Sequence, residues 1–148
     1  MMLLALILAQ SASTYIDGTT SPHTVVLDCR VVSLTADDVM RFAATVEYSG
    51  GSAGHNHHVH VRVKPVNNDF PSAETHPAEG GSFSNRPFAM VDSWRGQELF
   101  YSFELPSKPD FGSVAESGIA RLDLMVGDYP GERIAAGLCT MSVESRTA

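Results

Sequence analysis

GHNHHVHVRVKP, residues 54–65, combines four of the chain's six histidines with a strict two-residue alternation of side-chain types. Successive side chains of an extended strand point to opposite faces of a sheet. From about His57 onward, the alternation puts valines on one face and basic or imidazole side chains on the other: Val59, Val61 and Val63 against His58, His60, Arg62 and Lys64. The stretch therefore predicts a β-strand with one face in the core and one face in water.

The same alternation predicts further strands along the chain. They are expected at residues 24–34, 40–48, 88–94, 99–105, 119–126 and 134–143. Gly, Pro, Asn and Asp separate these segments, and no window of about eleven residues has helical spacing of apolar positions. We therefore predict an all-β, single-domain antiparallel β-sandwich, Ig-like or Greek-key, of about seven or eight strands, with a small β-barrel as the alternative.

The 148 residues are enough for one domain with a sizeable core. Residues 1–13 start with an apolar run and end in small and polar residues, which is typical of a secretory signal segment and too short to span a bilayer. We expect residues 14–148 to form one domain that is periplasmic or secreted and not inserted in a membrane. A long loop is expected around residues 66–87, with a short edge strand near 82–84, and one helical turn at 114–117.

The chain has two cysteines, Cys29 and Cys139. In an exported protein an isolated pair predicts a disulfide, and here it would join the first long strand to the last. A bridge that closes so long a loop could stabilise the fold by ~4–5 kcal/mol. Two buried free thiols are the alternative.

The histidines suggest a metal site, with zinc or copper as the cofactor. His58 and His60 would lie on one strand face roughly 6–7 Å apart at the backbone. Such a centre needs three or four donors, so further ligands are required. The candidates for these are His55, His57, His76, His23, Glu74 and Glu79.

Arg62 and Lys64 would share the face of His58 and His60, and their positive charges disfavour a cation there. Two other interpretations follow. The face could bind an anion such as a carboxylate through Arg62, Lys64 and protonated histidines. It could also be an ordinary solvated strand face.

Aromatic residues outside the regular strand pattern offer another type of site. They could form a platform for a carbohydrate or peptide, or they could complete the core. The candidates are Phe70, Phe83, Phe88, Trp94, Phe100 and Tyr129.

His58-Val59-His60 and the stretch from Gly131 to Cys139 resemble two short segments of the copper/zinc superoxide dismutases. The resemblance implies copper ligation by the His-Val-His pair, a substrate-guiding role for Arg133 and a bridging role for Cys139. The later copper-binding histidine and most zinc ligands of that family have no counterpart here. We interpret the resemblance as shared strand chemistry rather than kinship, and assign no dismutase activity.

The formal net charge of −7, without any run of lysines or arginines, argues against nucleic acid as a partner. No cysteine is placed as a nucleophile beside a histidine and no acidic pair is placed to flank a scissile bond, so we assign no catalytic residue. The sequence predicts an exported, non-enzymatic binding or structural module for a small ligand or a protein. The alternative is a periplasmic copper- or zinc-binding protein that uses the histidines of residues 55–60.

Overall fold

The computed structural model describes residues 15–17, 23–48, 59–75, 86–106, 113–115, 118–127 and 131–145. Their strands are β1 (Tyr15–Asp17), β2 (His23–Ser33), β3 (Val39–Tyr48), β4 (Val59–Pro65), β5 (Ala73–Thr75), β6 (Phe88–Trp94), β7 (Gln97–Glu104), β8 (Ser113–Ala115), β9 (Gly118–Val126) and β10 (Glu132–Ser145). Strands β1 and β8 form a small sheet of their own, and the other eight form one large sheet. No helix occurs in the described residues.

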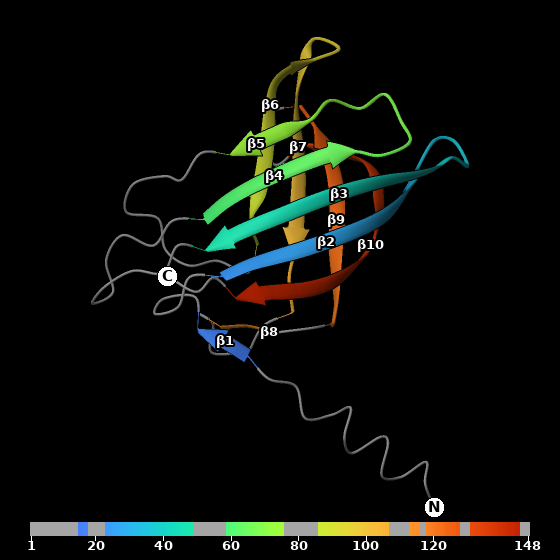
Figure 1. Cartoon of the computed structure of the whole chain (residues 1–148). Helices are drawn as coiled ribbons and strands as arrows, with labels where there is room; N and C mark the ends of the chain where they lie inside the picture. The colour runs from blue at the N-terminus through green and yellow to red at the C-terminus, as the bar shows by residue number, and fades with distance from the viewer. Residues whose placement is uncertain are drawn as a thin grey trace, which may run out of the picture.

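The large sheet has the order β5-β4-β3-β2-β10-β9-β7-β6, and every neighbouring pair is antiparallel. The last strand, β10, returns to pair with the first, β2. Figure 1 shows the sheet curling so that its two ends, β5 and β6, come side by side. The sheet is therefore nearly closed into a barrel, which leaves only short strand edges exposed.

The all-β antiparallel class is confirmed: the eight strands form one sheet that is nearly closed into a barrel, which is consistent with both predicted architectures, the sandwich and the small barrel. The predicted strands at 24–34, 40–48, 88–94, 99–105, 119–126 and 134–143 are confirmed as β2, β3, β6, β7, β9 and β10, with small shifts at their ends. The strand predicted from His57 is described from Val59 onward, as β4.

Some local predictions need correction, and others fall outside the described residues. The long loop predicted at 66–87 is interrupted by a short strand that the sequence did not predict, Ala73–Thr75, which pairs with Val61–Val63 of β4. In place of the helical turn predicted at 114–117, residues 113–115 form β8. In both places the residues form a strand because backbone hydrogen bonds to a neighbouring strand outweigh the local turn propensity. The edge strand predicted near 82–84 and the signal segment of residues 1–13 lie outside the described residues.

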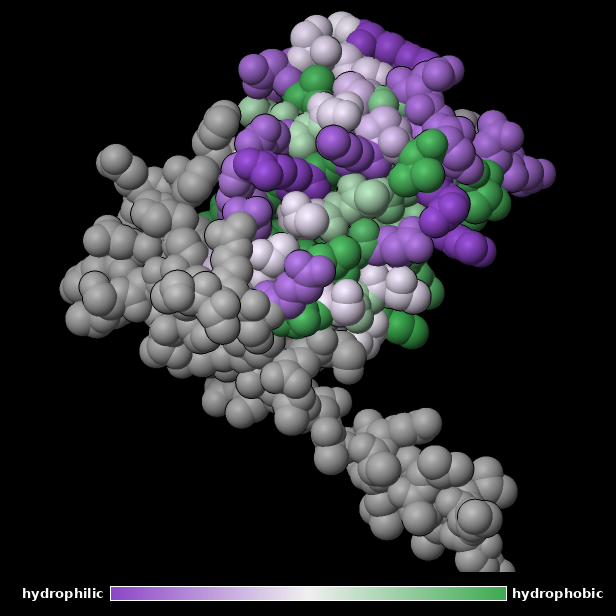
Figure 2. Space-filling view, viewed as in Figure 1, coloured by the Kyte–Doolittle hydropathy of each residue, from purple (hydrophilic) through white to green (hydrophobic). Residues whose placement is uncertain are grey.

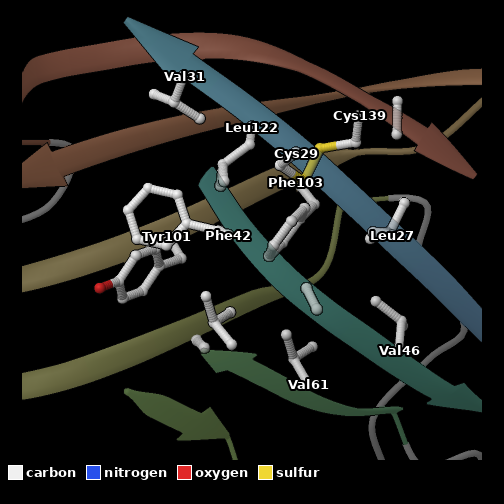
Figure 3. Packing of buried hydrophobic residues seen from close by; sticks show 14 of the residues in the cluster. Leu27, Cys29, Val31, Phe42, Val46, Val61, Tyr101, Phe103, Leu122 and Cys139 are labelled. Atoms are coloured by element: carbon white, nitrogen blue, oxygen red, sulfur yellow. A yellow bond between two sulfur atoms is a disulfide. The ribbon is translucent and has the colours of Figure 1, made fainter. Parts of the chain in front are cut away.

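The inward side chains of all the barrel strands pack together into one core (Figure 3). The largest fully buried members are Tyr48, Tyr101, Phe42, Phe103, Leu27, Leu99, Leu105, Leu122 and Leu124. Each comes from an alternating strand or from the residue just after one, so the period-two pattern places bulky apolar groups inside. Burial of this apolar surface is the main force that holds the sheet closed.

Cys29 of β2 and Cys139 of β10 lie directly opposite each other and form a disulfide, with their Cα atoms 3.9 Å apart. Both residues are fully buried. The predicted disulfide is therefore confirmed, and the alternative of two free thiols is wrong. Disulfides are typical of oxidising compartments, which agrees with an exported protein. Within the described residues, no helix is long and apolar enough to cross a membrane.

Side-chain contacts join the two ends of the sheet. The Thr75 hydroxyl donates a hydrogen bond to the carbonyl oxygen of Phe88, at 2.5 Å, and so links β5 to β6. The buried Tyr101 hydroxyl of β7 donates to the carbonyl oxygen of Pro71, also at 2.5 Å. These bonds hold the segment before β5 against the β6–β7 hairpin.

Replacing Tyr101 with phenylalanine is expected to lower the free energy of unfolding by about 1–2 kcal/mol, because the Pro71 carbonyl loses its donor. Burial raises the pKa of the Tyr101 phenol above its ordinary value of 10.0. Because folding raises this pKa, the Tyr101 phenol contributes its full stabilisation below pH 10. That contribution is lost as the pH rises above 10 toward the raised pKa. Urea unfolding of both proteins at pH 8 and above pH 10 tests this. The variant should lose less stability on that pH rise, and an equal loss in both proteins would contradict the assignment.

Candidate functional site

One end of the barrel carries a pocket of about 380 Å³, a volume in the range of small-molecule sites. Its lining combines apolar and polar side chains from several strands and turns: Ser33, Thr35, Asp38, Met40, Phe70, Trp94, Arg95, Gln97, Val126, Ile134 and Ala135. We call it the mouth pocket. Figure 2 shows this end of the molecule at the upper right, where hydrophilic residues surround hydrophobic ones.

A second hollow of about 370 Å³ adjoins the mouth pocket. The two share Asp38, Met40, Phe70, Trp94 and Arg95, so they meet at these five residues. The second hollow adds Val39 and the polar loop Asn67–Asp69. The barrel end therefore offers two connected spaces around one aromatic centre.

Phe70 is positioned by two asparagines that tie its loop to strand β3. The Asn67 side chain accepts a hydrogen bond from the Arg41 backbone N–H at 2.8 Å, and Asn68 donates one to the Arg41 carbonyl at 3.0 Å. Asn68 also accepts from the Phe70 N–H at 3.0 Å, which is the geometry of an Asx turn. The Phe70 ring then packs edge-on against Phe42 of the core, with 5.9 Å between ring centroids.

Trp94 ends strand β6 and leads into the two-residue turn Arg95-Gly96. Both turn residues have positive φ, 52° and 79°, as in the type I′ turn favoured in tight hairpins. The indole stacks on Phe70, with 4.9 Å between centroids and 20° between ring planes. The Arg95 guanidinium lies 4.5 Å from the centroid of the Trp94 ring. Phe70, Trp94 and Arg95 thus form a contacting set at the pocket wall.

The predicted aromatic patch is brought together only in part. Phe70 and Trp94 meet at the mouth pocket. Phe88 and Phe100 contact each other instead, with 6.2 Å between centroids, on the outside of the β6–β7 hairpin. Phe83 and Tyr129 lie outside the described residues. The sequence analysis did not select Asp38 or Arg95 as site residues. The one local signal was the Arg95-Gly96 pair, which is typical of a tight turn and concerns Arg95 only.

Of the six histidines proposed as metal ligands, only His60 of β4 and His23, the first residue of β2, lie in the described residues. The Nε2 atom of His60 is hydrogen-bonded to Oε1 of Glu74 at 2.6 Å, and the His60 side chain is 17% exposed. Among the described residues, no group of three or more His, Cys, Asp or Glu could hold a metal ion. His55, His57, His58 and His76 lie outside them, so zinc or copper binding stays a prediction.

Arg62 and Lys64, the residues predicted to bind an anion, both lie on the outer face of β4. Arg62 Nε is 3.5 Å from Oε1 of Glu74, so this guanidinium already has a carboxylate partner. Lys64 is exposed and pairs in register with Ala43 of β3. An anion site here stays a prediction, and a ligand would compete with Glu74 for Arg62.

The His60–Glu74–Arg62 cluster lowers the pKa of the Glu74 carboxyl below its ordinary value of 4.5. The hydrogen bond with His60 is the main cause, desolvation opposes it, and the charge of Arg62 acts with it. Because folding lowers this pKa, the Glu74 carboxylate contributes its stabilisation above pH 4.5. That contribution is lost as the pH falls through the lowered pKa. The cluster therefore adds to the backbone pairing of β4 with β5 at neutral pH, and this contribution is lost in acid.

Replacing His60 with alanine should raise the pKa of Glu74 toward its ordinary value, because the main lowering contact is lost. Side-chain carbon NMR of Glu74 through an acid titration measures this shift. Arg62→Gln is the matched control and should give a smaller rise. If Arg62→Gln moves the pKa more than His60→Ala does, His60 is not the controlling partner.

Residues 50–54 read Gly-Gly-Ser-Ala-Gly, which is the spacing of a nucleophile elbow, but they lie outside the described residues. Arg133, the substrate-guiding candidate of the dismutase resemblance, is 3.7 Å from the Asp123 carboxylate.

A further hollow of about 590 Å³ lies on the outer face of β2, β9 and β10. Its exposed lining includes Arg30, Ile119 and Leu138, and it has no aromatic side chain. Ligand sites usually combine apolar or aromatic walls with convergent polar groups. The mouth pocket meets this description better, and we take it as the candidate site.

Fold and pocket together define the class of protein: a small antiparallel β-barrel with a ligand-sized pocket at one end. Comparisons with protein-family models, with curated proteins and with solved structures find no match for this chain. Its function is therefore argued from the chemistry of the pocket alone.

Proposed function

We propose that this chain is an exported, non-enzymatic β-barrel module that binds a small ligand in the mouth pocket. The observation that carries the proposal is the Phe70–Trp94 stack, which lines the pocket and packs, partly buried, against the edge of the core. The part of these rings that faces the pocket offers apolar contact surface to a ligand. The polar side chains of Ser33, Thr35 and Gln97 line the same space and could fix the orientation of a ligand.

Two further observations support the other parts of the proposal. The apolar run of residues 1–13 and the buried Cys29–Cys139 disulfide favour export to the periplasm or beyond the cell. Among the residues that line the mouth pocket there is no histidine, cysteine or lysine, so the Ser33 and Thr35 hydroxyls have no imidazole or amine base beside them. A binding role therefore suits this pocket better than catalysis.

The proposal is tested by a screen of small-molecule fragments against the full chain, with backbone amide NMR as the readout. Binding compounds should shift the resonances of Trp94, Arg95 and Gln97. Trp94→Ala should abolish the binding, because it removes the stacked indole. Phe88→Ala is the control, since it removes an aromatic ring that is 46% exposed but outside the pocket.

Binding that survives Trp94→Ala, or that Phe88→Ala removes equally, would place the ligand elsewhere. A screen in which no compound shifts the mouth-pocket resonances would overturn the proposed function.

A further inference from the structure

The described charges around the mouth pocket are mainly acidic. Asp38 lines both connected hollows and Asp69 lines the second, while Arg95 is the one basic residue of either lining. Asp37 precedes Asp38 in the same exposed loop. Within the described residues, neither aspartate at the pocket forms an ion pair. The space therefore has a negative potential that attracts cations.

The aromatic centre of the pocket already holds a cation. The Arg95 guanidinium lies 4.5 Å from the Trp94 centroid, within the distance at which a ring face attracts positive charge. Arg95 is exposed, and it forms no ion pair within the described part of the chain. Within the described residues, the contact with the Trp94 ring is the one interaction that holds this guanidinium in place. Another cation could therefore replace it.

We propose that the mouth pocket takes a small organic cation, whose charged group replaces the Arg95 guanidinium on Trp94 and is neutralised by Asp38. This inference rests on the proposed function and adds the chemical class of the ligand. Quaternary ammonium and guanidinium groups suit the site, because both are weakly hydrated cations that aromatic faces bind well. The Phe70 ring stacks on the indole and supports it, and the side chain of Met40 lines the same pocket and supplies an apolar contact for the methyl or methylene groups of such a cation.

The chain contains a single tryptophan, so its fluorescence reports directly on this site. The test titrates the full chain with choline and with 3,3-dimethylbutan-1-ol, the uncharged compound of the same shape, at fixed ionic strength. Choline should change the Trp94 fluorescence saturably and bind at least about tenfold more tightly than the alcohol. Equal binding of the two compounds would overturn the cation proposal.

Three variants locate the charge effect. Arg95→Asn removes the competing guanidinium, and asparagine accepts the positive φ of this turn, so choline should bind about threefold more tightly. Asp38→Asn should weaken choline binding about fivefold. Glu144→Gln makes the same change in net charge at an exposed position outside both linings and should leave binding unchanged.

The outcomes separate this inference from the proposed function. If neutral or anionic fragments bind at Trp94 but choline binds neither the natural chain nor the Arg95→Asn variant, the pocket is a ligand site and the cation proposal is wrong. If Glu144→Gln weakens choline binding as much as Asp38→Asn does, the effect is one of overall charge and the assignment of Asp38 is wrong. Thermal melting of each variant verifies that it remains folded.

Discussion

Replacing Gly137 with alanine is expected to lower the free energy of unfolding by about 3 kcal/mol or more. Gly137 of β10 lies opposite Val31 of β2, in the pairing at the middle of the eight-stranded sheet. An added Cβ atom would lie 1.9 Å from the carbonyl oxygen of Arg30 and 2.6 Å from Cα of Val31. These are backbone atoms, so no side-chain rotation can relieve the overlap.

The surroundings of Gly137 prevent an easy shift of either strand. The disulfide between Cys29 and Cys139 fixes the two strands two residues away. Strand β2 is also paired with β3 on its other side, and β10 with β9. The β2–β10 ladder would therefore have to break locally to admit a methyl group.

Urea unfolding measures the effect of Gly137→Ala. The matched control is Leu138→Ala on the neighbouring residue, whose side chain is 60% exposed, and it should cost at most about 0.5–1 kcal/mol. Similar losses for the two variants would mean that β2 and β10 do not approach so closely at Gly137.

The strands and their buried faces could be predicted from the sequence because both follow from local alternation. In β7, for example, the inward set Leu99, Tyr101 and Phe103 is fully buried, as the pattern requires. The choice between sandwich and barrel could not be predicted in this way. Alternation says which side chains face the core, but it does not say which strands pair. One long-range pairing was accessible, because two isolated cysteines predict that β2 and β10 are neighbours.

The candidate site was less predictable, because its parts come from distant segments. Phe70 and Trp94 were both aromatic candidates, but their stacking depends on Asn67 and Asn68 holding the loop to the backbone of Arg41. Those hydrogen bonds span 26 and 27 residues. No periodic pattern reports contacts of that kind. The basic strand face of Arg62 was visible in the sequence, whereas its partner Glu74 lies on β5, which the sequence did not predict at Ala73–Thr75.

Removing the disulfide in a Cys29→Ala, Cys139→Ala double variant is expected to lower the free energy of unfolding by about 4–5 kcal/mol. The two cysteines are 110 residues apart, so the bridge restricts nearly the whole unfolded domain. It joins the first and last strands of the large sheet in chain order, and their pairing lies at the middle of that sheet. Without the bridge, the β2–β10 ladder and its apolar contacts alone must offset the entropy of bringing these distant strands together.

Urea unfolding of three samples separates the bridge from the volume of the side chains. The oxidised natural chain and the same chain in strong reductant differ only in the bond. The reduced chain and the double alanine variant differ only in the two buried sulfur atoms. Most of the loss should fall in the first comparison, together with a larger dependence of unfolding free energy on urea, since the unbridged chain exposes more surface when unfolded. The oxidised and reduced natural chains could instead differ by less than about 1 kcal/mol in free energy of unfolding. That result would mean that β2 and β10 stay together in the unfolded chain or that the bond strains the barrel. Either explanation would refute the entropic role assigned to the disulfide.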